Sequence, residues 1–288
     1  MNNNQINLKV AIHNLHCLPA MPDIAQRLLL LNLESVDGER ELLKLIEQDP
    51  QISAKLIGLS NAPLFGTAKN ISSIQDAATR LGLTRVKSVT LGIAVMTVLI
   101  KPPMGKLDLQ ALWMHSLNIS LALTVLSQAM PHHTRPSDDE MFLAGLLHDI
   151  GYMVLNHLDM ARSDALHQRF ANEPERPWQE IEQEQLELSH AELGAALAKH
   201  WDLPESIVAV ICYHHHPEDN RALIGHPLVS MVHLAEKMLP EYGTHTHPTI
   251  EIDAEEWKKL GIDPALAESI QKKINAQLDA SKAADAFN

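Results

Sequence analysis

The sequence has few aromatic residues, few glycines and only two cysteines. Aromatic residues make up 4% of the 288 residues while hydrophobic residues make up 45%, so the core must consist mainly of Leu, Ile, Val, Ala and Met. A Leu-rich chain with 12 glycines favours helices over strands. Cys17 and Cys212 lie far apart without a CxxC spacing, which argues against a zinc ribbon and fits a reducing cytosol.

The chain also has little positive charge and no long hydrophobic run. Its formal net charge of −13 repels polyanions and no stripe of Lys and Arg is evident, so nucleic acid is not an expected partner. The polar start of the chain lacks the order of a signal peptide, and we expect a cytoplasmic protein. The most apolar run, Val86 to Ile100, is interrupted by Lys87 and is shorter than the ~20 residues that span a bilayer. It predicts a buried core helix and no membrane partner.

Apolar residues recur at helical spacing along most of the chain, and no segment shows a convincing strand pattern. In the first half, helices are expected after Leu18-Pro19, from an N-cap at Asp37, after Asp49-Pro50, and on either side of Gly82 at 74–81 and 84–100. In the second half, helices are expected at about 108–130, 139–158, 178–201, 204–215 and 226–239. The fold class is therefore predicted to be all-α.

A Pro-containing linker at 101–105 divides the chain into an N-terminal helical lobe and a lobe that holds most of the histidines. We expect an N-terminal segment at 1–17, one domain at 18–242 with lobes at 18–105 and 106–242, and a C-terminal helical extension at 243–288. In this extension Leu266, Ile270, Ile274 and Leu278 recur every four residues. Such a stripe must pack on the body or on a partner.

The strongest chemical signal is His148-Asp149, which lies within a strongly apolar segment at 142–155. An ionised Asp is rarely buried unless a cation or several hydrogen-bond donors compensate its desolvation. A His beside it indicates a shared metal ion. The alternative is an ordinary hydrogen bond between the two side chains.

Other histidines are expected to point inward, among them at least one of His214 and His215. His115 lies in a predicted apolar helix, His190 shares a helix face with core residues, and His214 and His215 end another helix. Each one alone is typical of a satisfied core or capping histidine. Several imidazoles together with a carboxylate favour one or two divalent ions of Mn, Fe, Ni or Zn over Ca.

These residues occur in the order found in the HD superfamily of metal-dependent phosphohydrolases, and the other short motifs resemble the HDOD domain within it. Those motifs are Leu18-Pro19-x-x-Pro22, Asp49-Pro50, Ser53-Ala54-Lys55-Leu56-x-x-Leu59-x-Asn61, Leu81-Gly82, Leu112-Trp113-x-His115-Ser116, Gly145-Leu146-Leu147-His148-Asp149-Ile150-Gly151, His190-Ala191-Glu192-x-Gly194 and Trp201-Asp202-Leu203-Pro204. The resemblance implies a helical HDOD fold, with the N-terminal lobe packed on an HD-type bundle. It also implies a regulatory or scaffold role in bacterial signal transduction with protein partners, and many HDOD members have no demonstrated enzymatic activity.

Two departures from the hydrolytic HD pattern stand out. Glu236 occupies the place where these enzymes usually carry a late Asp, and its longer side chain can still bind a metal. Tyr152 stands where HD proteins that cleave cyclic-di-GMP carry a Lys. The cyclic-di-GMP activity therefore does not carry over.

The resemblance implies two metal sites that share one carboxylate. His115, His148 and Asp149, with or without Glu236, would hold one ion, and His190, His214 and His215 would complete a second site with Asp149 as the bridge. One hypothesis is a phosphohydrolase or phosphodiesterase for a nucleotide-like phosphate, with Asp149 as its catalytic residue. The others are a regulatory scaffold and a sensor that binds a nucleotide without cleaving it. No cation is placed near the motif, which favours regulation.

Overall fold

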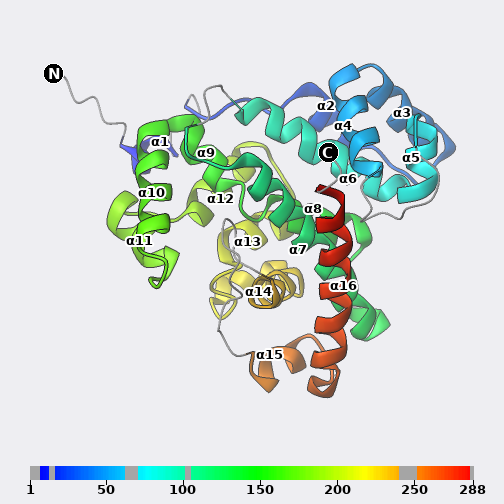
Figure 1. The fold of residues 1–288 in the computed structure, drawn as a ribbon. Helices are drawn as coiled ribbons and strands as arrows, with labels where there is room; N and C mark the ends of the chain where they lie inside the picture. The colour runs from blue at the N-terminus through cyan, green and yellow to red at the C-terminus, as the bar shows by residue number, and fades with distance from the viewer. Residues whose placement is uncertain (1–6, 13–16, 62–70, 101–104, 240–251, 286–288) are drawn as a thin grey trace.

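The computed structural model describes residues 7–12, 17–61, 71–100, 105–239 and 252–285. These residues form helices and contain no strand, which confirms the all-α prediction (Figure 1). The α-helices are α1 (Leu8–Ala11), α2 (Asp23–Leu30), α3 (Val36–Glu47), α4 (Pro50–Ser60), α5 (Ile74–Leu81), α6 (Leu83–Leu99), α7 (Leu109–Ala129), α8 (Asp138–Leu147), α9 (Gly151–Leu158), α10 (Met160–Asn172), α11 (Trp178–Leu186), α12 (His190–His200), α13 (Glu205–Tyr213), α14 (Leu228–Met238), α15 (Ala254–Lys259) and α16 (Ala267–Asp285). Short 3₁₀ helices lie at η2 (His132–Thr134), η3 (Asn220–Gly225) and η4 (Pro264–Leu266).

Local signals define the helix ends in the N-terminal lobe, α2 to α6. The Asp49 side chain accepts hydrogen bonds from two main-chain N–H groups of α4, and Pro50 follows at the first helical position. Gly82 separates α5 from α6 with a φ of 82°, a value that favours glycine. The N-cap of α3 is Ser35 rather than Asp37, which lies inside the first turn, because the Ser35 hydroxyl accepts the capping hydrogen bond.

The N-terminal lobe packs on the second half of the chain mainly through α6, which lies on α8. A Cβ atom added to Gly92 would lie 2.1 Å from a methyl carbon of Leu146, so this glycine permits the close approach of the two helices. Lys87 of α6 forms an ion pair with Asp139 of α8 at 3.1 Å. Most of α6 is buried, as predicted for the apolar run.

Helix α7 forms the centre of the second half and contacts α8, α14 and α16. A Cβ atom on Gly145 would lie 2.6 Å from the Cα of Ser120, so α8 lies directly against the α7 backbone. By length and composition α7 could cross a membrane, but 61% of its most apolar window is buried inside the protein. This burial is what a core helix of a globular domain shows.

Two predicted helices are broken in the structure, and α10 was not expected. The helix predicted at 139–158 is interrupted at 148–150, where the N–H of Ile150 bonds to the carbonyl of Leu147, three residues back. The helix predicted at 178–201 ends at Leu186 because Glu187 adopts a left-handed conformation, with φ of 59°. The next helix starts with a capping box between Ser189 and Glu192. Both breaks lie beside predicted metal ligands.

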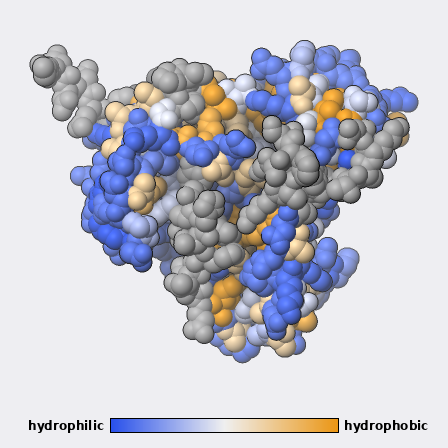
Figure 2. Space-filling view, in the orientation of Figure 1, coloured by the Kyte–Doolittle hydropathy of each residue, from blue (hydrophilic) through white to orange (hydrophobic). Residues whose placement is uncertain are grey.

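The C-terminal helices pack back on the body. Ile270, Ile274 and Leu278 of α16 are buried and the helix lies along α7, while Leu266 in η4 stays 42% exposed. Trp257 of α15 is buried as well. The face of the molecule drawn in Figure 2 is mostly hydrophilic with small separate hydrophobic areas. The apolar stripe predicted in the sequence therefore packs on the body of the same chain.

Candidate metal centre

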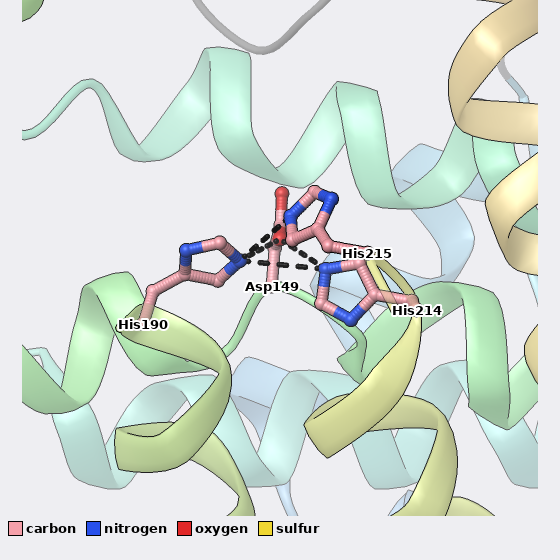
Figure 3. A group of neighbouring side chains, drawn as sticks. All are labelled: Asp149, His190, His214 and His215. Atoms are coloured by element: carbon pink, nitrogen blue, oxygen red, sulfur yellow. Dashed lines mark hydrogen bonds and ion pairs between the residues drawn. The ribbon is translucent and has the colours of Figure 1, made fainter. Parts of the chain in front are cut away.

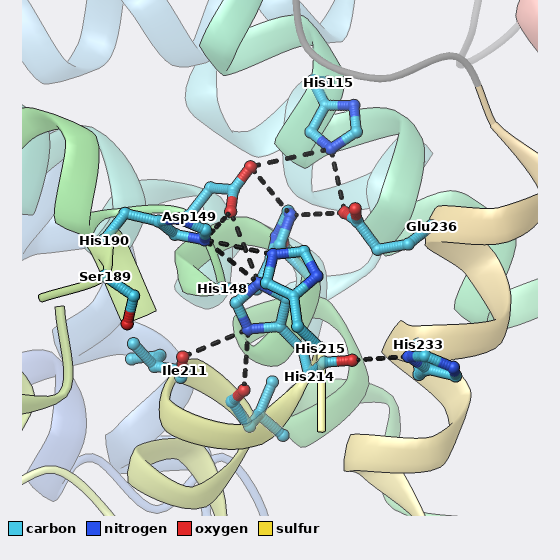
Figure 4. A network of polar contacts seen from close by, with 12 residues as sticks. His115, His148, Asp149, Ser189, His190, Ile211, His214, His215, His233 and Glu236 are labelled. Atoms are coloured by element: carbon cyan, nitrogen blue, oxygen red, sulfur yellow. Dashed lines mark hydrogen bonds and ion pairs between the residues drawn. The ribbon is translucent and has the colours of Figure 1, made fainter. Parts of the chain in front are cut away.

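The structure brings all seven predicted ligands together at one buried place (Figure 4). They come from different elements, namely α7, the turn between α8 and α9, the start of α12, the end of α13 and α14. In this order the residues are His115, His148 and Asp149, His190, His214 and His215, and Glu236. They form two groups of four, and Asp149 belongs to both.

The first group consists of His115, His148, Asp149 and Glu236. Oε1 of Glu236 lies 3.0 Å from Nε2 of His115 and 2.8 Å from Nε2 of His148. Oδ2 of Asp149 lies 3.8 Å and 3.3 Å from the same two nitrogens. Two imidazoles and two carboxylates thus converge on one point, with a donor set that suits a transition metal.

The second group consists of Asp149, His190, His214 and His215 (Figure 3). The other oxygen of Asp149, Oδ1, lies 3.2 Å from Nε2 of His190 and 3.6 Å from Nε2 of His214. Nε2 of His190 also lies 3.4 Å from Nε2 of His214 and 3.3 Å from Nε2 of His215. Each oxygen of Asp149 therefore faces a different group, which is the geometry of a bridging carboxylate.

The outer nitrogens of three imidazoles are held by hydrogen bonds. Nδ1 of His148 donates to the carbonyl of Gly145 at 2.7 Å, and Nδ1 of His214 donates to two carbonyls of α13 at 3.1 Å each. Nδ1 of His190 donates to the carboxylate of Glu182 at 2.7 Å. In the neutral form of each imidazole, with its proton on Nδ1, the lone pair of Nε2 would point into the cluster, as metal-binding histidines require.

The environment of His148 Nε2 indicates whether this cluster suits a cation. This nitrogen is buried and makes no hydrogen bond, although the oxygens of Glu236 and Asp149 lie close to it. A buried nitrogen of this kind costs free energy unless a partner satisfies it. A cation between the groups would satisfy it, so the residues present fit a metal ion.

The buried charges shift the pKa values of two carboxylates and two imidazoles of the cluster. Burial raises the pKa of Asp149 and Glu236, but the neighbouring imidazoles outweigh it and hold both pKa values well below the usual range. Burial disfavours the charged form of His190, yet Glu182 and Asp149 raise its pKa to about 10. The pKa of His148 is raised well above its usual value for the same reason, through Asp149 and Glu236. Metal binding here would displace protons.

His214 and His215 behave in the opposite way. Burial lowers the pKa of both, and the neighbouring imidazoles lower it further. For His214 these effects outweigh the hydrogen bond with Asp149, which raises the pKa. Both side chains are therefore neutral at pH 7 and offer lone pairs without losing a proton.

Known proteins resemble this chain over most of its length. The model of the HDOD domain family matches residues 18–217. The chain belongs to the HDOD family. A relative from Treponema pallidum (strain Nichols), an uncharacterized protein, is 27% identical over 214 residues, which are 71% of this chain and 40% of that protein. The chain thus spans about two fifths of the length of the curated relative.

Solved structures share the HDOD fold. An HDOD domain protein with unknown function from Geobacter sulfurreducens is 26% identical, with a TM-score of 0.70, and 94% of this chain and 98% of that one are covered. A candidate signal transduction protein from Marinobacter aquaeolei VT8 has a TM-score of 0.79 at 23% identity, covering 98% of this chain and 64% of that one. A candidate phosphohydrolase from Shewanella amazonensis SB2B has a TM-score of 0.69 at 23% identity, covering 94% and 97%.

The sequence did not predict two contacts that support His190, one from Glu182 and one from Tyr152. Glu182 is fully buried and accepts hydrogen bonds from both Nδ1 and the main-chain N–H of His190. The Tyr152 ring stacks on the His190 ring at 4.4 Å between centroids. Glu182 lies four residues after Trp178 and four before Leu186, so its position on an apolar helix face was the available signal.

Gly151 allows the turn at residues 148–150 to lie against α12. A Cβ atom on Gly151 would lie 1.8 Å from the carbonyl oxygen of His190 and 3.0 Å from the main-chain nitrogen of Gly194. Only glycine permits this approach of the two backbones. The contact brings Asp149, two residues earlier in the chain, within reach of His190.

A cavity of about 40 Å³ opens beside the cluster. The described residues that line it are His115, Asp149, Tyr152, Trp178, Gln179, His215 and Glu236, and no Lys or Arg is among them. Lys87 is paired with Asp139, and Arg80 donates to a carbonyl of α4, both in the N-terminal lobe or at its border. The predicted lack of a phosphate-binding cation therefore holds for the described lining.

Proposed function

We propose that this HDOD protein is a cytoplasmic signal-transduction module that binds two divalent cations and acts through protein partners. The observation that carries the metal proposal is Asp149, whose two oxygens face two different groups of three further ligands. His115, His148 and Glu236 would hold one ion with Asp149, and His190, His214 and His215 would hold the other. Imidazole-rich sets with shared carboxylates suit Mn, Fe, Ni or Zn better than Ca.

The charge balance of the site supports the binding of cations. Asp149, Glu236 and Glu182 place three carboxylates in buried or half-buried positions, and burial of so much negative charge is costly without compensation. With three carboxylates, one dication would leave a net charge of −1 and two would leave +1, so bound cations compensate most of this charge. The two separate ligand groups support the proposal of two ions. The same reasoning accounts for the raised pKa values of His148 and His190 when protons stand in for the cations.

The cavity supports a regulatory role over nucleotide turnover. A drug-sized ligand occupies a pocket of roughly 300 Å³ or more, whereas this cavity of about 40 Å³ has room for a few waters or a small anion. The described lining offers no cation that could bind the other phosphates of a nucleotide. We therefore propose that the centre stabilises a protein surface for partners, rather than processing a nucleotide.

The second candidate is a metal-dependent phosphohydrolase, and the paired ligand groups favour it specifically. Two adjacent divalent cations supply Lewis acidity that stabilises the charge developing on a phosphate ester. Asp149 would orient both ions, and the half-buried Glu236 carboxylate faces the cavity where a small phosphate ester would enter. The name of the similar Shewanella protein agrees with this candidate.

Elemental analysis of protein purified without chelator tests the proposal. We expect two equivalents of transition metal per chain, and their loss in the double variant His148→Ala, Asp149→Ala. The exposed His132 and His133, changed to Ala together, provide a matched control that should keep the metal. Metal absent from the wild type even after Mn or Fe supplementation would reject both candidates. With metal bound, turnover of p-nitrophenyl phosphate or cyclic nucleotides would select the phosphohydrolase, and its absence the regulatory module.

A further inference from the structure

A second and larger cavity lies away from the metal centre, between the N-terminal lobe and α7. Its volume is about 340 Å³, within the range of about 300–1,000 Å³ that small-molecule pockets occupy. Helices α4, α6 and α7 each contribute to its wall. The lining residues are Lys55, Leu59, Ile93, Met96, Leu109, Gln110 and Trp113.

The wall of this groove is apolar and continues inward. A narrow space of about 10 Å³ lies deeper and shares Met96, Leu109 and Trp113 with the groove. It reaches the backbone turn at Asp149 and Ile150 along the border of α6 and α7. The groove is thus an opening into the apolar contact between the two lobes, and it suits a ligand with an aliphatic chain.

The lining of the groove includes one positively charged side chain, Lys55. Lys55 is the only charged residue of the described lining, is exposed, and forms no ion pair among the described residues. The Gln110 side chain adds an amide donor at the first turn of α7. On a chain of net charge −13, an unpaired ammonium group beside an apolar wall selects an anionic headgroup.

We infer that this groove binds a single-chain amphiphile with one carboxylate, such as a medium-chain fatty acid. The aliphatic chain would lie along Ile93, Met96 and Trp113, and the carboxylate would face Lys55. A nucleotide fits poorly, because several phosphate oxygens would meet a single cation. A partner protein fits poorly as well, because a stable interface buries about 800 Å² on each partner, far more than a groove of this size offers. The lining of the groove itself contains no predicted metal ligand, although Asp149 lines part of the narrow space behind it, and the proposal does not depend on the proposed function.

Isothermal titration calorimetry with octanoate, decanoate and 1-octanol tests this site. We expect decanoate to bind roughly tenfold more tightly than octanoate, because two more methylene groups are buried. At low salt the attraction of Lys55 should offset the one methylene group that octanoate buries less than octanol. The preference for octanoate, measured as the ratio of the two affinities, should fall roughly threefold in Lys55→Met. Lys199→Met, a change of another exposed lysine on α12, is the matched control and should retain the preference.

Met96→Trp fills the groove at a half-buried position and should abolish binding of all three probes. Circular dichroism and thermal melting verify that this variant folds, and the Lys55→Met result stands without it. Absence of heat with every probe, or unchanged binding in Met96→Trp, would overturn the proposal. So would equal losses in Lys55→Met and Lys199→Met. A wild-type dimer that Met96→Trp dissociates, seen by light scattering without any binding of decanoate, would show that a second copy covers the groove instead.

Discussion

Gly151 is the most sensitive point at which to test how the fold positions the metal ligands. An alanine Cβ at this position would lie 1.8 Å from the carbonyl oxygen of His190, where 3.4 Å is the lower limit of ordinary contact. The obstacle is main chain, so no side-chain rotation relieves it. Helices α9 and α12 would have to separate by about 1.6 Å, the difference between these distances.

The size of the effect follows from this contact. Overpacking of a well-packed core costs about 1–3 kcal/mol, and the gain in helix propensity from Gly to Ala offsets roughly 0.5–1 kcal/mol of it. We expect Gly151→Ala to lower the melting temperature by about 5 °C, since 1 kcal/mol corresponds to roughly 2–4 °C in a chain of this size. The separation also moves Asp149 away from His190, whose ligand atoms are 3.2 Å apart, so metal affinity should fall by tenfold or more.

Gly58→Ala is the matched control for this experiment. Gly58 lies inside α4, and a Cβ atom there meets nothing within 4 Å. The change should raise stability by about 0.4–1 kcal/mol and leave metal content unaltered. Thermal unfolding followed by circular dichroism, with metal content from elemental analysis, measures both effects. If Gly151→Ala melts like Gly58→Ala and retains full metal, the close approach does not position the site.

Two further changes probe the surroundings of the centre. Glu182→Gln removes the charge that holds Nδ1 of His190. We expect the metal affinity, measured by competition with a chelator, to fall by roughly 10–100-fold. An equal loss in Glu180→Gln, an exposed neighbour on α11, would contradict the positioning role. Lys87→Met breaks the half-buried ion pair with Asp139 between the lobes. Urea denaturation should show that the free energy of unfolding falls by roughly 1 kcal/mol while the metal content is unchanged. A fall no larger than that of Lys199→Met would show that the ion pair adds nothing to stability.

The clustering of these residues could be predicted because several of them have a local signal. His148-Asp149 stands in a segment too apolar for an unpaired carboxylate, and His115 lies on a helix that must be buried. The HDOD motifs then fixed the order of the others. Glu182 has no such motif, and its role depends on the contact between α11 and α12, which becomes visible only when the two helices are placed in space.

Helix boundaries near the site were harder to predict, for two different physical reasons. At 148–150 the residues are compatible with a helix, and the break is a tightened turn that tertiary packing of Gly151 imposes. At 187–189 the signal was present, because Ser189 and Glu192 have the spacing of a capping box. The apolar periodicity on both sides of this break obscured it. Local propensity is therefore least informative where the ligands are brought together.

The stability of the fold offers a reason for retaining the full ligand set without catalysis. Asp149, His148 and Glu182 are buried, and their charges would be unfavourable in the interior if no counter-charge were present. A metal ion that binds only the folded state stabilises that state by mass action, by about 2.7 kcal/mol at a free concentration of 100 times Kd. The ligands come from elements spread between α7 and α14, so metal binding would tie together the whole second half of the chain. A structural metal would therefore account for this ligand set without catalysis.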